Sequence, residues 1–149
     1  MEQRYEPHEV SYAHVAVLNL RDGRIAVGVR LSKRSLMQDG RVWYEPYAVC
    51  SLYYGPSDIR NDSTRQAIPV IVADILRSVS HETRLLVIKG NTPHFQKYWQ
   101  LEPLINAFAI SSNRRVKVTQ KKHIELSIPE LMALANDAVN RGTSLTNTI

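Results

Sequence analysis

The sequence predicts a single mixed α/β domain in which helices flank a five-stranded sheet, with three antiparallel strands followed by two parallel ones. Three observations predict it: β-patterned runs separated by Asp-Gly turns, a helical spacing of apolar residues, and a short apolar run directly after that helix. The 149 residues, 44% of them hydrophobic, suit one domain with a core of its own. We expect this domain over residues 1–142 and a flexible polar tail over 143–149.

The first third predicts an antiparallel meander. Residues 12–20 are almost continuously apolar, as in a strand buried on both faces. An Asp-Gly pair at 22–23 is typical of a tight hairpin turn, and residues 25–31 then alternate apolar with small or basic side chains. After a second Asp-Gly turn, residues 41–54 predict a third strand, in which Pro46 indicates an edge position or a bulge.

The rest of the chain predicts helices alternating with parallel strands. Apolar residues recur at three-and-four spacing over 68–79, which predicts an amphipathic helix. The apolar run at 84–89 then predicts a buried parallel strand. Residues 94–108 predict one helix or two short ones, and 115–119 a fifth strand. A capping-box pattern and an apolar stripe over 127–141 predict the closing helix.

Several classes of protein are excluded by composition. No apolar run is long enough to span a bilayer, and the first residues lack the layout of a signal peptide, so we expect an intracellular protein with no membrane partner. The single cysteine, Cys50, predicts no disulfide and is interpreted as a small buried residue. The five histidines show no metal-ligand spacing, so we expect no metal; they are His8, His14, His81, His94 and His123. The glycines form no phosphate-binding loop, so we expect no cofactor.

The order of elements, with residues 116–123 followed by the helical residues 130–135, resembles the ribonuclease H family, which includes the nuclease domains of reverse transcriptases. The resemblance runs from Tyr12 to Gly142 and implies the fold of that family. Active members cleave the RNA of RNA–DNA hybrids with two divalent cations held by acidic residues. The family's loop histidine matches His123, whose role lapses without metal ligands.

The positions matching the family's acidic residues carry none here. They are Asn19, Ala67, Gly90 and Ala133. Two Mg²⁺ ions need carboxylate oxygens, which amides and alkyl groups do not replace. The resemblance therefore implies a degenerate, non-catalytic version of the fold. We interpret Asp22 as a turn residue and Asp74 and Asp137 as surface charges, and a cluster of the three stays open as the alternative.

Basic residues give the clearest functional signal. Within a chain of formal net charge +5, a strip without acidic residues holds Arg114, Arg115, Lys117, Lys121 and Lys122. A second basic group flanks the turn between the second and third strands and consists of Arg30, Lys33, Arg34 and Arg41. Such residues bind phosphate backbones, so we predict binding of structured, hybrid or duplex nucleic acid. The alternatives are a protein-interaction module that docks partners on strand 41–54 and, third, a metal-dependent nuclease.

Overall fold

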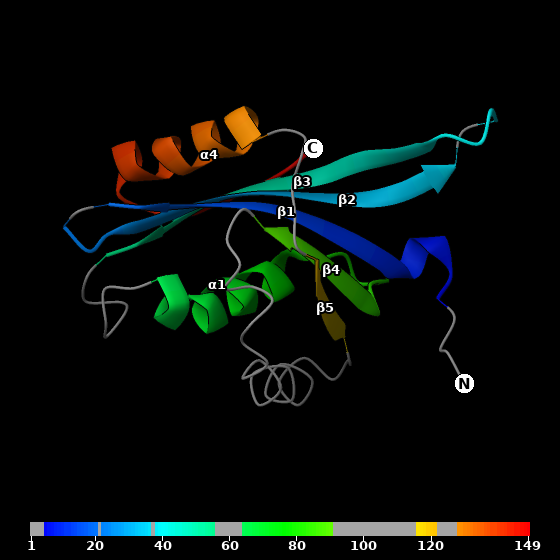
Figure 1. Ribbon diagram of the computed structural model, residues 1–149, viewed down its shortest axis with the longest axis horizontal. Helices are drawn as coiled ribbons and strands as arrows, with labels where there is room; N and C mark the ends of the chain where they lie inside the picture. Colours follow the sequence, from blue (N-terminus) through cyan, green and yellow to red (C-terminus); the bar gives the residue numbers. More distant parts are fainter. Residues whose placement is uncertain (1–4, 21, 37, 56–63, 91–115, 122–127) are drawn as a thin grey trace.

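The computed structural model describes residues 5–20, 22–36, 38–55, 64–90, 116–121 and 128–149. They form one mixed six-stranded sheet of order β5-β4-β1-β2-β3-β6, with helix α4 on one face and helix α1 on the other (Figure 1). The elements in chain order are η1 (Pro7–Glu9), β1 (Val10–Asn19), β2 (Ile25–Leu36), β3 (Val42–Tyr54), α1 (Thr64–Ser78), β4 (Leu85–Gly90), β5 (Lys117–Lys121), α4 (Ile128–Arg141) and β6 (Leu145–Thr148).

The predicted mixed α/β class is confirmed, but the predicted number of strands is wrong. The sixth strand comes from the segment that we expected to be a flexible tail: β6 pairs antiparallel with residues 48–51 of β3. Gly142, at φ 69°, ends α4, and the chain then runs back along the sheet. A polar, fully exposed segment pairs in this way because the outer edge of β3 offers backbone donors and acceptors, which bind another backbone whatever its side chains.

The antiparallel meander follows the prediction. β2 pairs with β1 and β3, and Gly23 and Gly40 take positive φ angles of 87° and 85° in the two Asp-Gly turns. Both explanations offered for Pro46 are correct: it lies beside a bulge, and on its outer side β6 pairs only with residues 48–51 of β3. Leu31 pairs with Ala48 and Ser32 with Pro46, so Tyr47 is an extra residue in β3. Along residues 48–51, β3 is an inner strand because β6 covers it.

The parallel strands also agree with the prediction. β4 runs parallel to β1, and β5 runs parallel to β4. Helix α1 precedes β4, as its apolar spacing indicates. The helical region predicted over 94–108 lies outside the described residues. Among the residues that the structure describes, no helix is both long and apolar enough to cross a bilayer.

The two faces of the sheet are packed differently. On the α1 face, large branched side chains of the sheet, among them Val27 and Leu31, form the main core with Ile75 and Leu76 of helix α1. The face under α4 carries small residues, and a Cβ on Gly28 would lie 1.8 Å from the carbonyl oxygen of Leu131. The small residues of β1 and β2 therefore allow α4 to lie almost directly on the strand backbones.

Candidate nucleic-acid interface

A row of basic residues and one histidine crosses the sheet at one level of the backbone register. Cross-strand pairs link neighbouring members on β5, β4, β1 and β2, which are Lys121, Lys89, His14 and Arg30; we call these four residues the cationic row. Side chains alternate between faces along a strand, so His14 and Arg30 share the α4 face with Ala16 and Gly28. At about 4.8 Å per strand, the row spans roughly 14 Å.

Two tyrosines hold Lys89 in place. Its ammonium donates a hydrogen bond to the Tyr44 hydroxyl at 3.1 Å and lies 5.0 Å from the centre of that ring. The ring of Tyr12 lies 5.7 Å from the same ammonium and meets Tyr44 edge to face, with the ring centres 5.0 Å apart. The charge of Lys89 is therefore positioned by neutral aromatic groups.

His14 lies in the middle of the cationic row. It is 5% exposed, and its ring meets Tyr44 edge to face at 5.3 Å. Burial, followed by the positive charges of Arg30 and Lys89, lowers the pKa of His14 to about 4. His14 is therefore neutral at pH 7, and Arg30 and Lys89 carry the charge on either side of it.

Arg30 joins the row to helix α4. Its guanidinium lies 3.2 Å from the carboxylate of Glu130 in the first turn of that helix. The capping-box pattern predicts that Glu130 caps the helix together with Ser127, but Ser127 lies outside the described residues. Among the described residues, the carboxylate of Glu130 pairs with Arg30.

The predicted basic strip is described in part. Lys117 is exposed on β5, and Lys121 pairs in the ladder with Lys89. Arg114, Arg115, Lys122 and also His123 lie outside the described residues. The described part of the strip therefore lies on β5, the outermost strand on that side of the sheet.

The structure separates the two predicted binding residues of β2. Arg34 is exposed and pairs across the ladder with Tyr44, on the same face as Arg30. Lys33 lies on the α1 face, where its ammonium donates to the carbonyl oxygen of His8 at 2.7 Å and to Glu82 at 2.9 Å. Lys33 is therefore not brought together with the cationic row.

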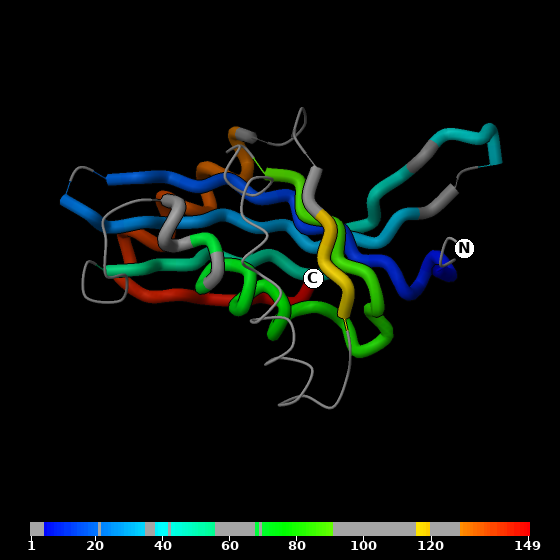
Figure 2. Tube along the Cα trace, turned by 60° about the horizontal axis from the view of Figure 1, so that its bottom comes forward, coloured from blue at the N-terminus to red at the C-terminus, as the bar shows by residue number. Residues whose placement is uncertain are grey.

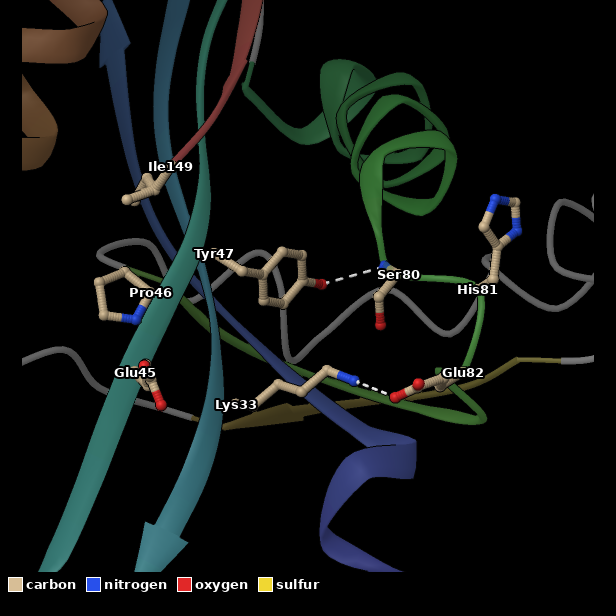
Figure 3. A pocket seen from close by; sticks show the side chains of 8 residues that line it. All are labelled: Lys33, Glu45, Pro46, Tyr47, Ser80, His81, Glu82 and Ile149. Carbon is tan, nitrogen blue, oxygen red and sulfur yellow. Dashed lines mark hydrogen bonds and ion pairs between the residues drawn. The ribbon is translucent and has the colours of Figure 1, made fainter.

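Lys33 instead lines a pocket of about 570 Å³ on the α1 face (Figure 3). In this pocket the hydroxyl of Tyr47, the bulge residue, accepts a hydrogen bond from the backbone N–H of Ser80 at 3.2 Å. Glu45, Glu82 and His81 contribute the other titratable groups. Because acidic groups balance its lysine, this pocket does not attract a polyanion.

The positions that the resemblance matched to metal-binding residues do not converge. Gly90 pairs with Val15, and Asn19 lies four residues further along β1, a distance of about 13 Å. Ala133 is exposed on α4, whereas Ala67 belongs to α1 on the opposite face.

The three aspartates of the alternative cluster are also apart. Asp22 binds Arg24 in the first hairpin turn, as expected of a turn residue. Asp74 on α1 accepts from the Tyr54 hydroxyl at 2.6 Å and pairs with Arg77, while Asp137 on α4 pairs with Arg141. Since α1 and α4 lie on opposite faces, these carboxylates share no site. Within the described ranges, no group of three or more His, Cys, Asp or Glu side chains is placed to hold a metal ion.

Sequence reasoning missed the aromatic part of the interface. Tyr12, His14 and Lys89 sit in runs that predict buried strands, and Tyr44 belongs to the predicted third strand. The available signal was that His14 and Lys89 interrupt otherwise apolar strands. Cys50, by contrast, is buried as predicted, and burial raises the pKa of its thiol.

The chain matches no protein-family model and none of the curated proteins. Among solved structures it is distantly similar to the foamy viral protease-reverse transcriptase in complex with RNA/DNA hybrid, with a TM-score of 0.37 and 12% sequence identity. That likeness covers 95% of this chain and 21% of the viral one, so this chain spans about a fifth of that protein.

Proposed function

We propose that the protein binds the phosphate backbone of a structured, hybrid or duplex nucleic acid through the α4 face of its sheet, without cleaving it. The observation that carries this proposal is the cationic row, which places Lys89 and Arg30 at one level of the register on either side of a neutral histidine. Lys117, which is exposed on β5, adds a further positive charge near this row. Arrays of this kind release counterions from a polyanion and bind it without reading its sequence.

The proposal that there is no cleavage rests on where the carboxylates lie. A two-metal reaction needs several carboxylates within a few ångströms of two cations. Asp22, Asp74 and Asp137 each pair with an arginine instead, and the cationic row itself would repel a divalent ion.

The test is binding of a fluorescently labelled RNA–DNA hybrid over a salt series, with Mg²⁺ present. The double variant Lys89→Gln and Lys117→Gln should lower the slope of log affinity against log salt by about two, because each lost phosphate contact lowers it by nearly one. The matched control is Arg77→Gln on α1, which removes an exposed charge from the opposite face and should leave the slope unchanged.

Two results would overturn the proposal. A loss in the control half as large as that in the double variant, and so equal per charge removed, would mean that only net charge matters. Cleavage of the hybrid that needs Mg²⁺ and is lost in Asp22→Asn would make the protein a nuclease.

A protein-docking role is the second candidate, and it is favoured by Trp43. Figure 2 shows the β2–β3 hairpin reaching past the neighbouring strands, and on it Trp43 is 54% exposed. The edge of β3 near Trp43 is not covered by β6, which ends its pairing at Ala48. Absence of hybrid binding at low salt would favour this role over the first.

A further inference from the structure

The pocket on the α1 face lies beside a free stretch of sheet edge. The ladder between β3 and β6 ends at Ala48, and one further hydrogen bond runs from the N–H of Ile149 to the carbonyl oxygen of Tyr47 at 2.9 Å. Past this point, residues 42–46 of β3 pair only with β2 among the described residues. Both Ile149 and this part of β3 line the pocket (Figure 3). A strand that continued the line of β6 would therefore pass along the pocket.

The walls of the pocket are held in place by the protein's own contacts. Besides its backbone partner described above, the Tyr47 hydroxyl shares a hydrogen bond of 2.9 Å with the hydroxyl of Ser11, which is fully buried. The Lys33 ammonium is bound by Glu82 and by the carbonyl oxygen of His8. The hydrogen bond from Lys33 lowers the pKa of Glu82, so the two charges pair at pH 7. The pocket is therefore formed before any ligand binds, which lowers the cost of binding.

The remaining carboxylate of the pocket is that of Glu45. It is exposed, and within the described ranges its side chain makes no hydrogen bond and no ion pair, since the ammonium of its ladder partner Lys33 is held by Glu82. Trp43 lies two residues earlier in β3 and therefore on the same face, and its ring is exposed. A carboxylate next to an open indole ring is complementary to the basic side chain of arginine or lysine.

The backbone of β3 defines the rest of the ligand. Along residues 42–45, the outer edge of the strand offers peptide donors and acceptors, and another extended backbone is the group that satisfies a row of them at once. Side chains of such a strand alternate between faces, so every second one is directed to the side of Trp43 and Glu45. The edge and the carboxylate together therefore favour a peptide over a small cation.

We propose that an extended peptide of a partner protein adds to β3 along residues 42–45, in line with β6, and places a lysine or arginine side chain at the mouth of the pocket, against Trp43 and Glu45. The inference gives the docking role described above a site and a ligand class. It rests on that second candidate function and is independent of nucleic-acid binding, which uses the opposite face of the sheet.

The first test is the binding of a fluorescein-labelled peptide of six residues, with arginine at its third position and valine or threonine elsewhere. Fluorescence anisotropy should show saturable binding. Replacing the arginine by citrulline, which keeps its shape without the charge, should weaken binding about threefold. Glu45→Gln should weaken binding of the arginine peptide by the same factor and leave the citrulline peptide unaffected. The matched control, Asp137→Asn, removes an exposed carboxylate on α4 and should bind both peptides like the unchanged protein.

The second test concerns the backbone and the aromatic ring. The arginine peptide should slow hydrogen exchange of those amides of residues 42–45 that face away from β2, whereas residues 48–51, already paired with β6, should exchange as before. Trp43→Ala should weaken binding of the arginine peptide about threefold, because it removes the ring on which the cation lies.

Three results would overturn the site. The first is equal weakening in Glu45→Gln and Asp137→Asn, and the second is unchanged exchange at residues 42–45 when the peptide is bound. The third is a dimer of the protein in sedimentation that Trp43→Ala abolishes, because a second copy would then occupy this edge.

Hybrid binding separates this site from the proposed function. If the arginine peptide does not bind a protein that still binds the hybrid, the site is wrong and the nucleic-acid proposal stands. If the peptide binds a protein that does not bind the hybrid, this site and the docking role are supported and nucleic-acid binding is overturned.

Discussion

The two faces of the same sheet are put to different uses. On the α1 face, alternate residues of β1, β2 and β3 bury branched side chains in the main core. On the α4 face, the intervening residues are small under the helix and then cationic and aromatic beyond it. Alternation along a strand thus lets one face supply stability while the other carries charge that would be unfavourable in a core.

The largest expected effect comes from truncating the core on the α1 face. Ile75→Ala should lower the free energy of unfolding by about 4 kcal/mol, because it removes a fully buried side chain and leaves a cavity. Leu134→Ala, a partly buried position on α4, should cost about 1 kcal/mol by losing less buried apolar area. Urea unfolding of both variants measures the difference, and equal losses would contradict the contrast between the faces.

The next effect tests the close approach of α4. Gly28→Ala should cost about 3 kcal/mol, since the new methyl group would overlap the backbone of Leu131 and force the helix away from the sheet. Gly40→Ala is the control: its φ of +85°, unlike that of Gly28, is unfavourable for alanine, but nothing lies within 4 Å, so it should cost only about 1 kcal/mol. A Gly28 variant no less stable than the Gly40 variant would refute the close contact.

A third prediction concerns pH and the buried His14. Its pKa is about 4 in the folded protein and 6.5 as the ordinary value, so folding favours the neutral form. The stability from this group is complete above pH 6.5 and is lost as the pH falls toward 4. Between pH 7 and pH 5 the free energy of unfolding should fall by about 2 kcal/mol.

His14→Gln serves as the control for that titration. It should flatten the profile between pH 7 and pH 5, because the carboxyl groups whose pKa is lowered, Glu9, Asp22 and Glu82, titrate below this window. An unchanged slope in His14→Gln would assign the pH dependence to other groups.

The sequence predicted the α1 face better than the α4 face for a physical reason. Periodicity reports which residues are buried, so it indicated β1 to β5, α1 and α4. The Asp-Gly turns lie at residues 22–23 and 39–40, as predicted. It did not report the parallel register that sets Lys89 beside His14, because these residues are 75 positions apart.

The differences between the predicted and the observed arrangement have the same origin. Segment β6 has a polar sequence and is held by backbone pairing to β3, which leaves no apolar pattern to detect. Lys33 and Arg34 are neighbours in the sequence, yet they lie on opposite faces, so a basic cluster in the sequence was not one surface in the fold.

The smallest expected effect links the charge of the α4 face to binding. Glu130 and Asp137 both lie on α4, both are 54% exposed in their side chains, and each pairs with an arginine. Glu130→Gln and Asp137→Asn should each change the free energy of unfolding by less than about 1 kcal/mol, because exposed ion pairs contribute little.

Glu130→Gln alone should raise affinity for the RNA–DNA hybrid, by roughly twofold, because it releases Arg30 and removes a negative charge next to the cationic row. Asp137 lies two helical turns away, next to Arg141, so equal gains in both variants would mean that net charge, and not this face, determines binding.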